Sequence, residues 1–65
     1  MTPRYVVQNI LRTTRANRWM VFDTLFRVPA TVNERPQIDL SLDTALSMAE
    51  ELNGLDRELL MATLH

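Results

Sequence analysis

Cysteine and lysine are absent from this sequence of 65 residues, and glycine and histidine occur once each. Without cysteine, neither a disulfide nor a thiolate zinc site is possible. Gly54 is the only glycine, which excludes the glycine-rich loops that bind phosphates. The single histidine, His65, is the last residue and is poorly placed to anchor a buried metal. The sequence therefore predicts no metal site and no cofactor.

Side chains that would form a catalytic centre are equally scarce. Ser41 and Ser47 have no histidine or lysine near them in the sequence to activate them as nucleophiles. Glu50 and Glu51 are adjacent, and on a helix adjacent side chains point in different directions, so they are not a ready acid–base pair. We therefore expect a protein that binds rather than an enzyme.

Long apolar segments are missing too, since no run approaches the roughly 20 residues needed to cross a bilayer. Hydrophobic residues make up 46% and charged residues 23%, which is a globular composition. The start, residues 1–4, lacks the apolar stretch of a signal peptide. We expect one domain over residues 1–65, in the cytoplasm of a bacterial or phage-infected host cell. A chain this short has a thin stability margin, which favours a partner.

Charge is distributed unevenly along the chain. Residues 1–35 carry six of the seven arginines against two carboxylates, whereas residues 36–65 carry one arginine against six carboxylates. The sequence is thus a charge dipole with a basic first half and an acidic second half.

The first half has the composition of β-strands. Residues 4–11 and 18–24 are rich in β-branched and aromatic side chains, and a shorter segment at 28–33 resembles them. Pro29 lacks a backbone donor, which places that third strand at an edge. Residues 33–36 have turn chemistry. These patterns predict a small antiparallel three-stranded sheet.

A different interpretation applies to the start of the chain. Thr2 is a suitable helix cap with Pro3 in the first helical position, and apolar residues then follow at helical spacing. A helix there would convert the fold into a small all-α bundle.

The second half predicts helices. Ser41 is a good N-cap, Asp43 suits the first turn, and apolar side chains recur at helical spacing up to Gly54, a C-terminal stop signal. We expect the main helix at about 42–53. Asp56 can cap a second, short helix at about 57–64. The predicted fold is α+β, with the sheet packed on the main helix.

Strand alternation gives both faces of this sheet large apolar groups. Trp19 and Val21 share one face of their strand, and Met20 and Phe22 share the other. One main helix covers only one face, so the other is a candidate surface for a homodimer or a partner protein, unless the short helix covers it.

Two charged clusters are candidate binding surfaces. The acidic one lies on the solvent side of the main helix and at its ends, and it comprises Asp39, Asp43, Glu50, Glu51 and Asp56. The basic one is the polar connection between the first two strands, with Arg12, Arg15 and Arg18 at every third position. The first suits a basic protein surface, and the second suits nucleic-acid phosphates.

The arrangement of residue types has a counterpart among small mobile-element proteins. The chain resembles tiny ββα-type proteins of phages and plasmids in the order of its segments. These segments are residues 18–24, residues 29–32, and a helix that opens with Ser41-Leu42-Asp43 and ends with Glu51-Leu52-Asn53. Anti-CRISPR proteins, phage-encoded inhibitors of CRISPR effector complexes, are similar in size, acidic surface and lack of cofactors.

The resemblance implies a non-catalytic inhibitor that binds a protein partner, such as a CRISPR effector subunit, and blocks its basic nucleic-acid-binding surface as a nucleic-acid mimic. It carries no residue-level motif. The alternatives are a small nucleic-acid-binding regulator that uses the arginine-rich connection, and a structural subunit of a phage or plasmid assembly. Direct nucleic-acid binding is the less favoured of these expectations, and no membrane association is expected.

Overall fold

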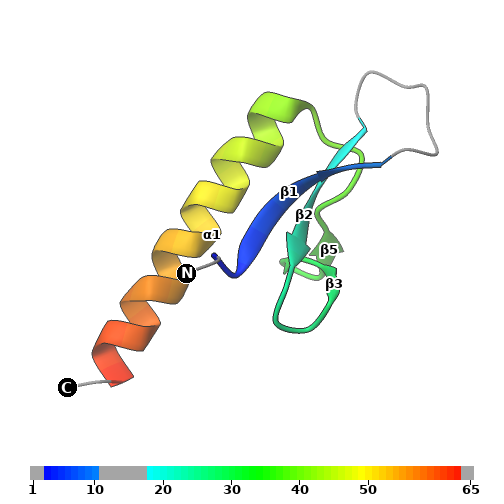
Figure 1. Ribbon diagram of the computed structural model, residues 1–65. Helices are drawn as coiled ribbons and strands as arrows, with labels where there is room; N and C mark the ends of the chain where they lie inside the picture. Colours follow the sequence, from blue (N-terminus) through cyan, green and yellow to red (C-terminus); the bar gives the residue numbers. More distant parts are fainter. Residues whose placement is uncertain (1–2, 11–17, 64–65) are drawn as a thin grey trace.

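A three-stranded antiparallel sheet packs against one long C-terminal helix (Figure 1). The computed structural model describes residues 3–10 and 18–63. The sheet has the order β1-β2-β3, and a separate two-stranded hairpin, β4-β5, precedes the helix. The elements are β1 (Tyr5–Asn9), β2 (Trp19–Asp23), β3 (Val28–Pro29), β4 (Thr31–Val32), β5 (Arg35–Pro36) and α1 (Leu42–Thr63).

The β-branched and aromatic residues of the first half form the two longest strands, as their composition predicts. β1 and β2 pair antiparallel, with Val7 opposite Val21 at the centre of the register. The start of the chain is therefore a strand, and the all-α bundle is wrong. Both strands are shorter than expected, because the described pairing covers residues 5–9 and 19–23.

The edge of β2 that faces away from β1 pairs with two later segments of the chain. Near its end, Phe22 pairs with Pro29 of β3. Near its start, Trp19 exchanges two backbone hydrogen bonds with Leu40, at 3.0 and 2.8 Å. Between these points the Val21 N–H donates to the carbonyl of Gln37 at 3.0 Å. The chain therefore passes the same edge twice, and this edge of the sheet is covered.

The expected third strand at 28–33 is divided in the structure. β3 ends at Pro29, and Ala30 is buried at the point where β4 begins in a different sheet. The turn between β4 and β5 consists of Asn33 and Glu34, both with positive φ, 51° and 66°. Two such residues are the geometry of a tight type I′ hairpin. The turn predicted at 33–36 is therefore confirmed at its first two residues, whereas Arg35 and Pro36 form β5.

α1 begins where the sequence predicts. The hydroxyl of Ser41 accepts a hydrogen bond from the Thr44 N–H at 3.3 Å, which caps the first turn. The helix then continues for 22 residues to Thr63. The stop at Gly54 and the separate helix at 57–64 were therefore wrong.

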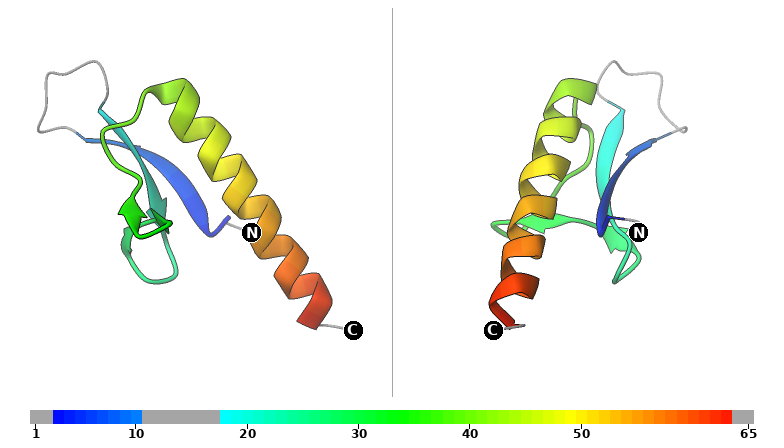
Figure 2. Two further views of the ribbon diagram at one scale, coloured as in Figure 1. Left: turned by 180° about the vertical axis from the view of Figure 1, so that it is seen from behind. Right: turned by 60° about the vertical axis from the view of Figure 1, so that its left-hand side comes forward.

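The core lies between the helix and one face of the sheet. Val21, Ala30, Ala45 and Ala49 are its buried apolar residues. Side chains that pack around them include Tyr5 and Val7 from β1, Trp19 from β2, and Met48 and Leu52 from α1. Small alanines on the helix allow it to approach the sheet closely. Figure 2 shows the helix on one side of the sheet only, so the face with Met20 and Phe22 is not covered by α1.

Candidate functional site

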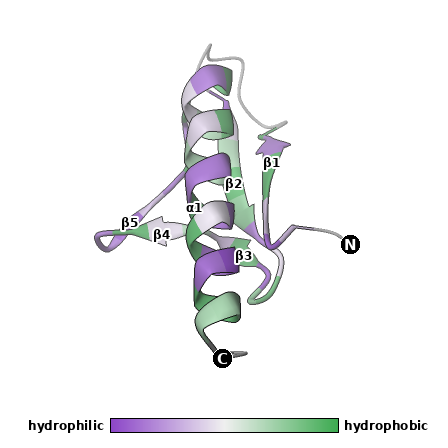
Figure 3. Cartoon of the chain, turned by 90° about the vertical axis from the view of Figure 1, so that its left-hand side faces the viewer, coloured by the Kyte–Doolittle hydropathy of each residue, from purple (hydrophilic) through white to green (hydrophobic). Residues whose placement is uncertain are grey.

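The solvent side of α1 carries four exposed carboxylates, which we call the acidic face. Asp43, Glu50 and Glu51 were predicted from the sequence, and each is exposed. Glu58 is also exposed and lies seven residues, or two turns, after Glu51, so it belongs to the same side. In Figure 3 the hydrophilic bands of the helix face the viewer, away from β2.

Glu58 was missed by the sequence prediction because the helix was expected to stop at Gly54. Once α1 is continuous, the seven-residue spacing from Glu51 is the signal that identifies it. The two remaining predicted carboxylates lie elsewhere. Asp39 is exposed in the loop before α1, with a positive φ of 54°. Asp56 is half-buried and binds Arg4 rather than facing solvent.

The structure describes one of the three arginines of the predicted basic cluster. Arg12 and Arg15 lie outside the described residues. Arg18 is described, and it is exposed immediately before β2. A nucleic-acid-binding role for these three arginines therefore stays a prediction.

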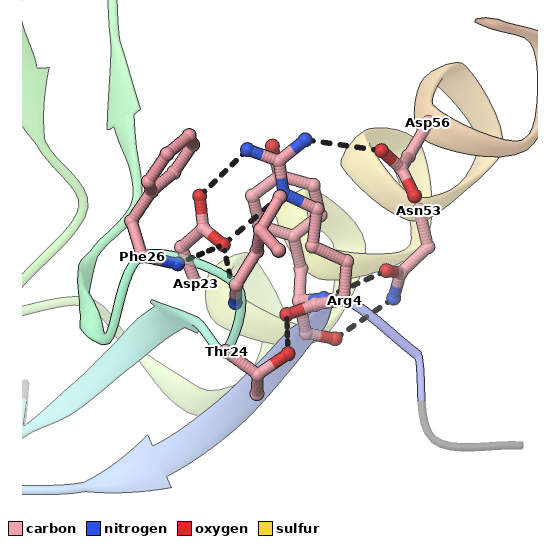
Figure 4. A network of polar contacts seen from close by, with 8 residues as sticks. Arg4, Asp23, Thr24, Phe26, Asn53 and Asp56 are labelled. Carbon is pink, nitrogen blue, oxygen red and sulfur yellow. Dashed lines mark hydrogen bonds and ion pairs between the residues drawn. The ribbon is translucent and has the colours of Figure 1, made fainter. Parts of the chain in front are cut away.

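Arg4 joins the sheet to the helix through an ion-pair network (Figure 4). Its Nε and Nη2 donate to the two carboxylate oxygens of Asp23, at 3.1 and 3.0 Å, and its Nη1 donates to Asp56 Oδ1 at 3.1 Å. Its Cζ lies 5.0 Å from the ring centroid of Tyr5 and 5.2 Å from that of Phe26, within cation–π range. One guanidinium thus contacts β1, the β2–β3 turn and α1.

Asp23 is the buried centre of this network. Its side chain accepts from Arg4 and from the backbone N–H groups of Leu25 and Phe26. These hydrogen bonds, that of Arg4 above all, hold the pKa of Asp23 below its ordinary value, although burial acts in the opposite direction. Ionised Asp23 therefore stabilises the fold above its ordinary pKa of about 3.9, and this stabilisation is lost as the pH falls through the lowered value.

Asn53 makes a second polar joint between α1 and β1. Its Oδ1 accepts from the Tyr5 N–H at 2.9 Å, and its Nδ2 donates to the Tyr5 carbonyl at 2.8 Å. The side-chain amide thus pairs with the strand backbone as a neighbouring strand would. From the sequence, Asn53 and Asp56 were expected at helix ends, whereas both serve as attachments in the middle of α1.

Beyond these joints, the last part of α1 is apolar and exposed. The helix extends past the sheet toward the C-terminus in Figures 1 and 2. Its exposed large apolar side chains there are Leu55, Leu59, Leu60 and Met61. Leu25 and Phe26, in the turn beside Arg4, are also exposed. These exposed apolar side chains make this part of the surface a candidate contact surface.

The described residues contain no group of three or more histidine, cysteine or carboxylate side chains that would hold a metal ion. Within residues 3–10 and 18–63, no helix combines the length and apolar character that crossing a bilayer requires. Comparisons with protein-family models, curated proteins and solved structures found no match. The candidate functional features of the described residues are the acidic face, the apolar end of α1 and the edge of β1 that Asn53 contacts.

Proposed function

We propose that this protein is a non-catalytic inhibitor of the anti-CRISPR kind, which docks its acidic face on a basic, nucleic-acid-binding surface of a partner protein. The observation that carries the proposal is the position of four exposed carboxylates on one side of a single continuous helix. Asp43, Glu50, Glu51 and Glu58 are all exposed and all lie in α1.

The carboxylates of this face are free of internal ion pairs. Both ion pairs found among the described residues are made by Arg4, to Asp23 and Asp56, and neither involves the acidic face. Arg57 is the single cation of the helix. The face therefore keeps its negative potential available to an outside partner, and that potential speeds association with a basic surface.

Helical geometry sets the spacing of these charges. Asp43 and Glu50 are seven residues apart, as are Glu51 and Glu58, which corresponds to about 10 Å along the axis for each step. The whole face spans about 22 Å. Because the helix is already formed, docking it costs little ordering entropy. A row of carboxylates on such a rod suits a groove that otherwise binds a phosphate backbone.

The test compares two variants with the wild-type protein. In the first, D43N, E50Q, E51Q and E58Q together neutralise the acidic face with side chains of nearly the same shape. In the second, E34Q removes an exposed carboxylate in the β4–β5 turn, away from the helix. Each protein is immobilised and exposed to nuclease-treated bacterial lysate, and each is added to a DNA-binding assay of a purified CRISPR effector complex.

We expect the wild type and E34Q to retain a basic protein that salt releases, and to inhibit DNA binding. The fourfold variant should lose both properties while keeping its circular dichroism spectrum. Capture and inhibition that survive in the fourfold variant would rule out the acidic face as the docking surface. Absence of inhibition by the wild type would contradict the anti-CRISPR role itself.

A further inference from the structure

The outer edge of β1 offers unpaired backbone groups. At the two ends of the β1–β2 ladder, the Thr24 N–H donates to the Arg4 carbonyl at 2.8 Å and the Ile10 N–H donates to the Arg18 carbonyl at 2.6 Å. In an antiparallel ladder the backbone N–H and carbonyl groups of every second residue point to the neighbouring strand. Between Arg4 and Ile10 these groups therefore point alternately toward β2 and away from it. Those directed outward are Tyr5, Val7 and Asn9.

Within the described part of the chain, Tyr5 is the outward residue of these three whose backbone is paired. Asn53 binds the N–H and carbonyl of Tyr5. Among the described residues, no hydrogen bond reaches the outward N–H and carbonyl groups of Val7 and Asn9. β1 carries no lysine or proline within Tyr5–Asn9 to prevent pairing with another strand. In Figure 3 β1 stands at one side of the molecule, with no other strand beyond it.

Exposed leucines of α1 lie on the same side as this edge. Leu46 precedes Asn53 by seven residues, so both project from one side of the helix, and Asn53 marks that side as the one toward the edge of β1. Leu42 is one turn before Leu46. Leu42 is 41% exposed and Leu46 is 51% exposed. An open strand edge thus lies beside an open apolar strip of helix.

We infer that a second copy of this chain pairs with the outer edge of β1 through its own β1, in an antiparallel arrangement with the two-fold axis at Gln8. In that register Val7 of each copy lies opposite Asn9 of the other, and the two pairs exchange four backbone hydrogen bonds. Two three-stranded sheets become one six-stranded sheet, and β1 ceases to be an edge.

A copy of the chain fits this surface better than an isolated peptide strand. A peptide strand lies in the plane of the sheet and leaves Leu42 and Leu46 exposed. A two-fold axis perpendicular to the sheet places the helix of the second copy on the same face, antiparallel to α1. Asn53 binds Tyr5, and Gln8 along β1 and Leu46 along α1 lie at about the same distance from that contact. Leu46 is therefore the helix residue nearest the axis, and the two copies cover each other's leucines. The acidic face points away from the sheet and stays exposed in the dimer.

The decisive variant removes one outward donor and leaves the β1–β2 ladder intact. Asn9→Pro deletes the outward N–H at a position where an edge strand tolerates proline. Asn9→Ala is the matched control, because it loses the same side chain and keeps the N–H. The mass of the full-length protein in solution is measured by light scattering and sedimentation over a range of concentrations.

We expect the wild type and Asn9→Ala to have about twice the monomer mass, and Asn9→Pro to raise the dimer dissociation constant by at least about tenfold. In the wild type, the amides of Val7 and Asn9 should exchange slowly with solvent and lose this protection on dilution. A wild type that is monomeric at millimolar concentration would overturn the inference. Equal dimerisation of the proline and alanine variants would also overturn it, since another surface would then be responsible.

A second pair of variants covers the case in which Asn9→Pro does not fold. Leu46→Glu places a charge on the strip beside β1, whereas Ser47→Glu places the same charge on the acidic face. Selective weakening of the dimer by Leu46→Glu supports the inference, and equal effects of the two variants contradict it. None of these outcomes depends on the acidic face, so the dimer and the proposed inhibition succeed or fail separately.

Discussion

The two parts of α1 have similar sequence patterns and different surroundings. In the first part, Leu42–Asn53, the inward positions Ala45 and Ala49 are 0% and 7% exposed under the sheet. In the second part, residues 55–63, apolar side chains recur at helical spacing, yet Leu59 and Leu60 are 68% and 53% exposed. Apolar periodicity therefore shows which side of a helix is suited to burial and does not show whether the fold buries it.

Element lengths explain the contrast. β1 and β2 are five residues each, which gives about 17 Å of strand. α1 has 22 residues and is about 33 Å long. The sheet therefore covers about half of the helix, which corresponds to the first twelve residues or so. The remaining turns extend beyond the sheet as a bare apolar end.

Polar contacts hold the helix at the boundary between its covered and bare parts. Asn53 binds Tyr5 of β1, and Asp56 binds Arg4 one turn later. The largest effect on stability is expected from Arg4→Met, because it leaves Asp23 buried, ionised and without its cation. We expect the free energy of unfolding to fall by about 2–3 kcal/mol, measured by urea denaturation at a fixed protein concentration.

Arg57→Met is the control for that substitution. Arg57 is an exposed cation on the same helix, and the structure gives it no ion pair among the described residues. Its loss should change stability by no more than about 0.5 kcal/mol. Equal effects of the two substitutions would mean that the Arg4 network contributes only as an ordinary surface ion pair does.

Local patterns were sufficient to predict much of this fold. β-branched residues predicted β1 and β2, Ser41 predicted the start of α1, and Asn33 and Glu34 predicted a turn. Each of these signals acts within a few residues, so the sequence shows it directly. Three members of the acidic face were found for the same reason.

Contacts between distant residues account for what was missed. Asn53-Gly54 is a typical helix end by composition, but the Asn53 amide is held by Tyr5, 48 residues earlier in the chain. Asp56 resembled the cap of a new helix and instead binds Arg4, 52 residues earlier. With Asn53 attached to Tyr5 and Asp56 attached to Arg4, the helix continues through a residue that otherwise favours an end. That continuity also brings Glu58 onto the acidic face, which no local signal showed.

A second prediction compares the covered and bare parts of α1 directly. Leu52 packs against the core, whereas Leu55, three residues later, is 52% exposed. Leu52→Ala should lower the free energy of unfolding by about 1–2 kcal/mol, because it leaves a partly filled space under the sheet. Leu55→Ala should lower it by less than about 0.5 kcal/mol. Similar losses would mean that the end of α1 is covered in the free protein.

The smallest effect is expected at Gly54, where the two parts of the helix meet. Glycine in the middle of a helix destabilises it relative to alanine, because the unfolded chain loses more freedom on folding. Gly54 has no positive φ, and a Cβ placed there meets no atom within 4 Å other than those of its chain neighbours and the nearby helix backbone. Gly54→Ala should therefore raise the free energy of unfolding by about 0.5–1 kcal/mol, as measured by urea denaturation.

The sign of that change discriminates between a continuous helix and two helices. If the chain left the helical conformation at Gly54, as its composition suggests, the residue there would adopt the left-handed geometry of a helix end, and alanine would be destabilising. A loss of stability in Gly54→Ala would thus mean that the helix is broken at Gly54 and that Glu58 is separate from the other three carboxylates. A gain is expected because the contacts of Asn53 with Tyr5 and of Asp56 with Arg4 keep both sides of Gly54 in one helix, so that residue 54 needs no special backbone freedom.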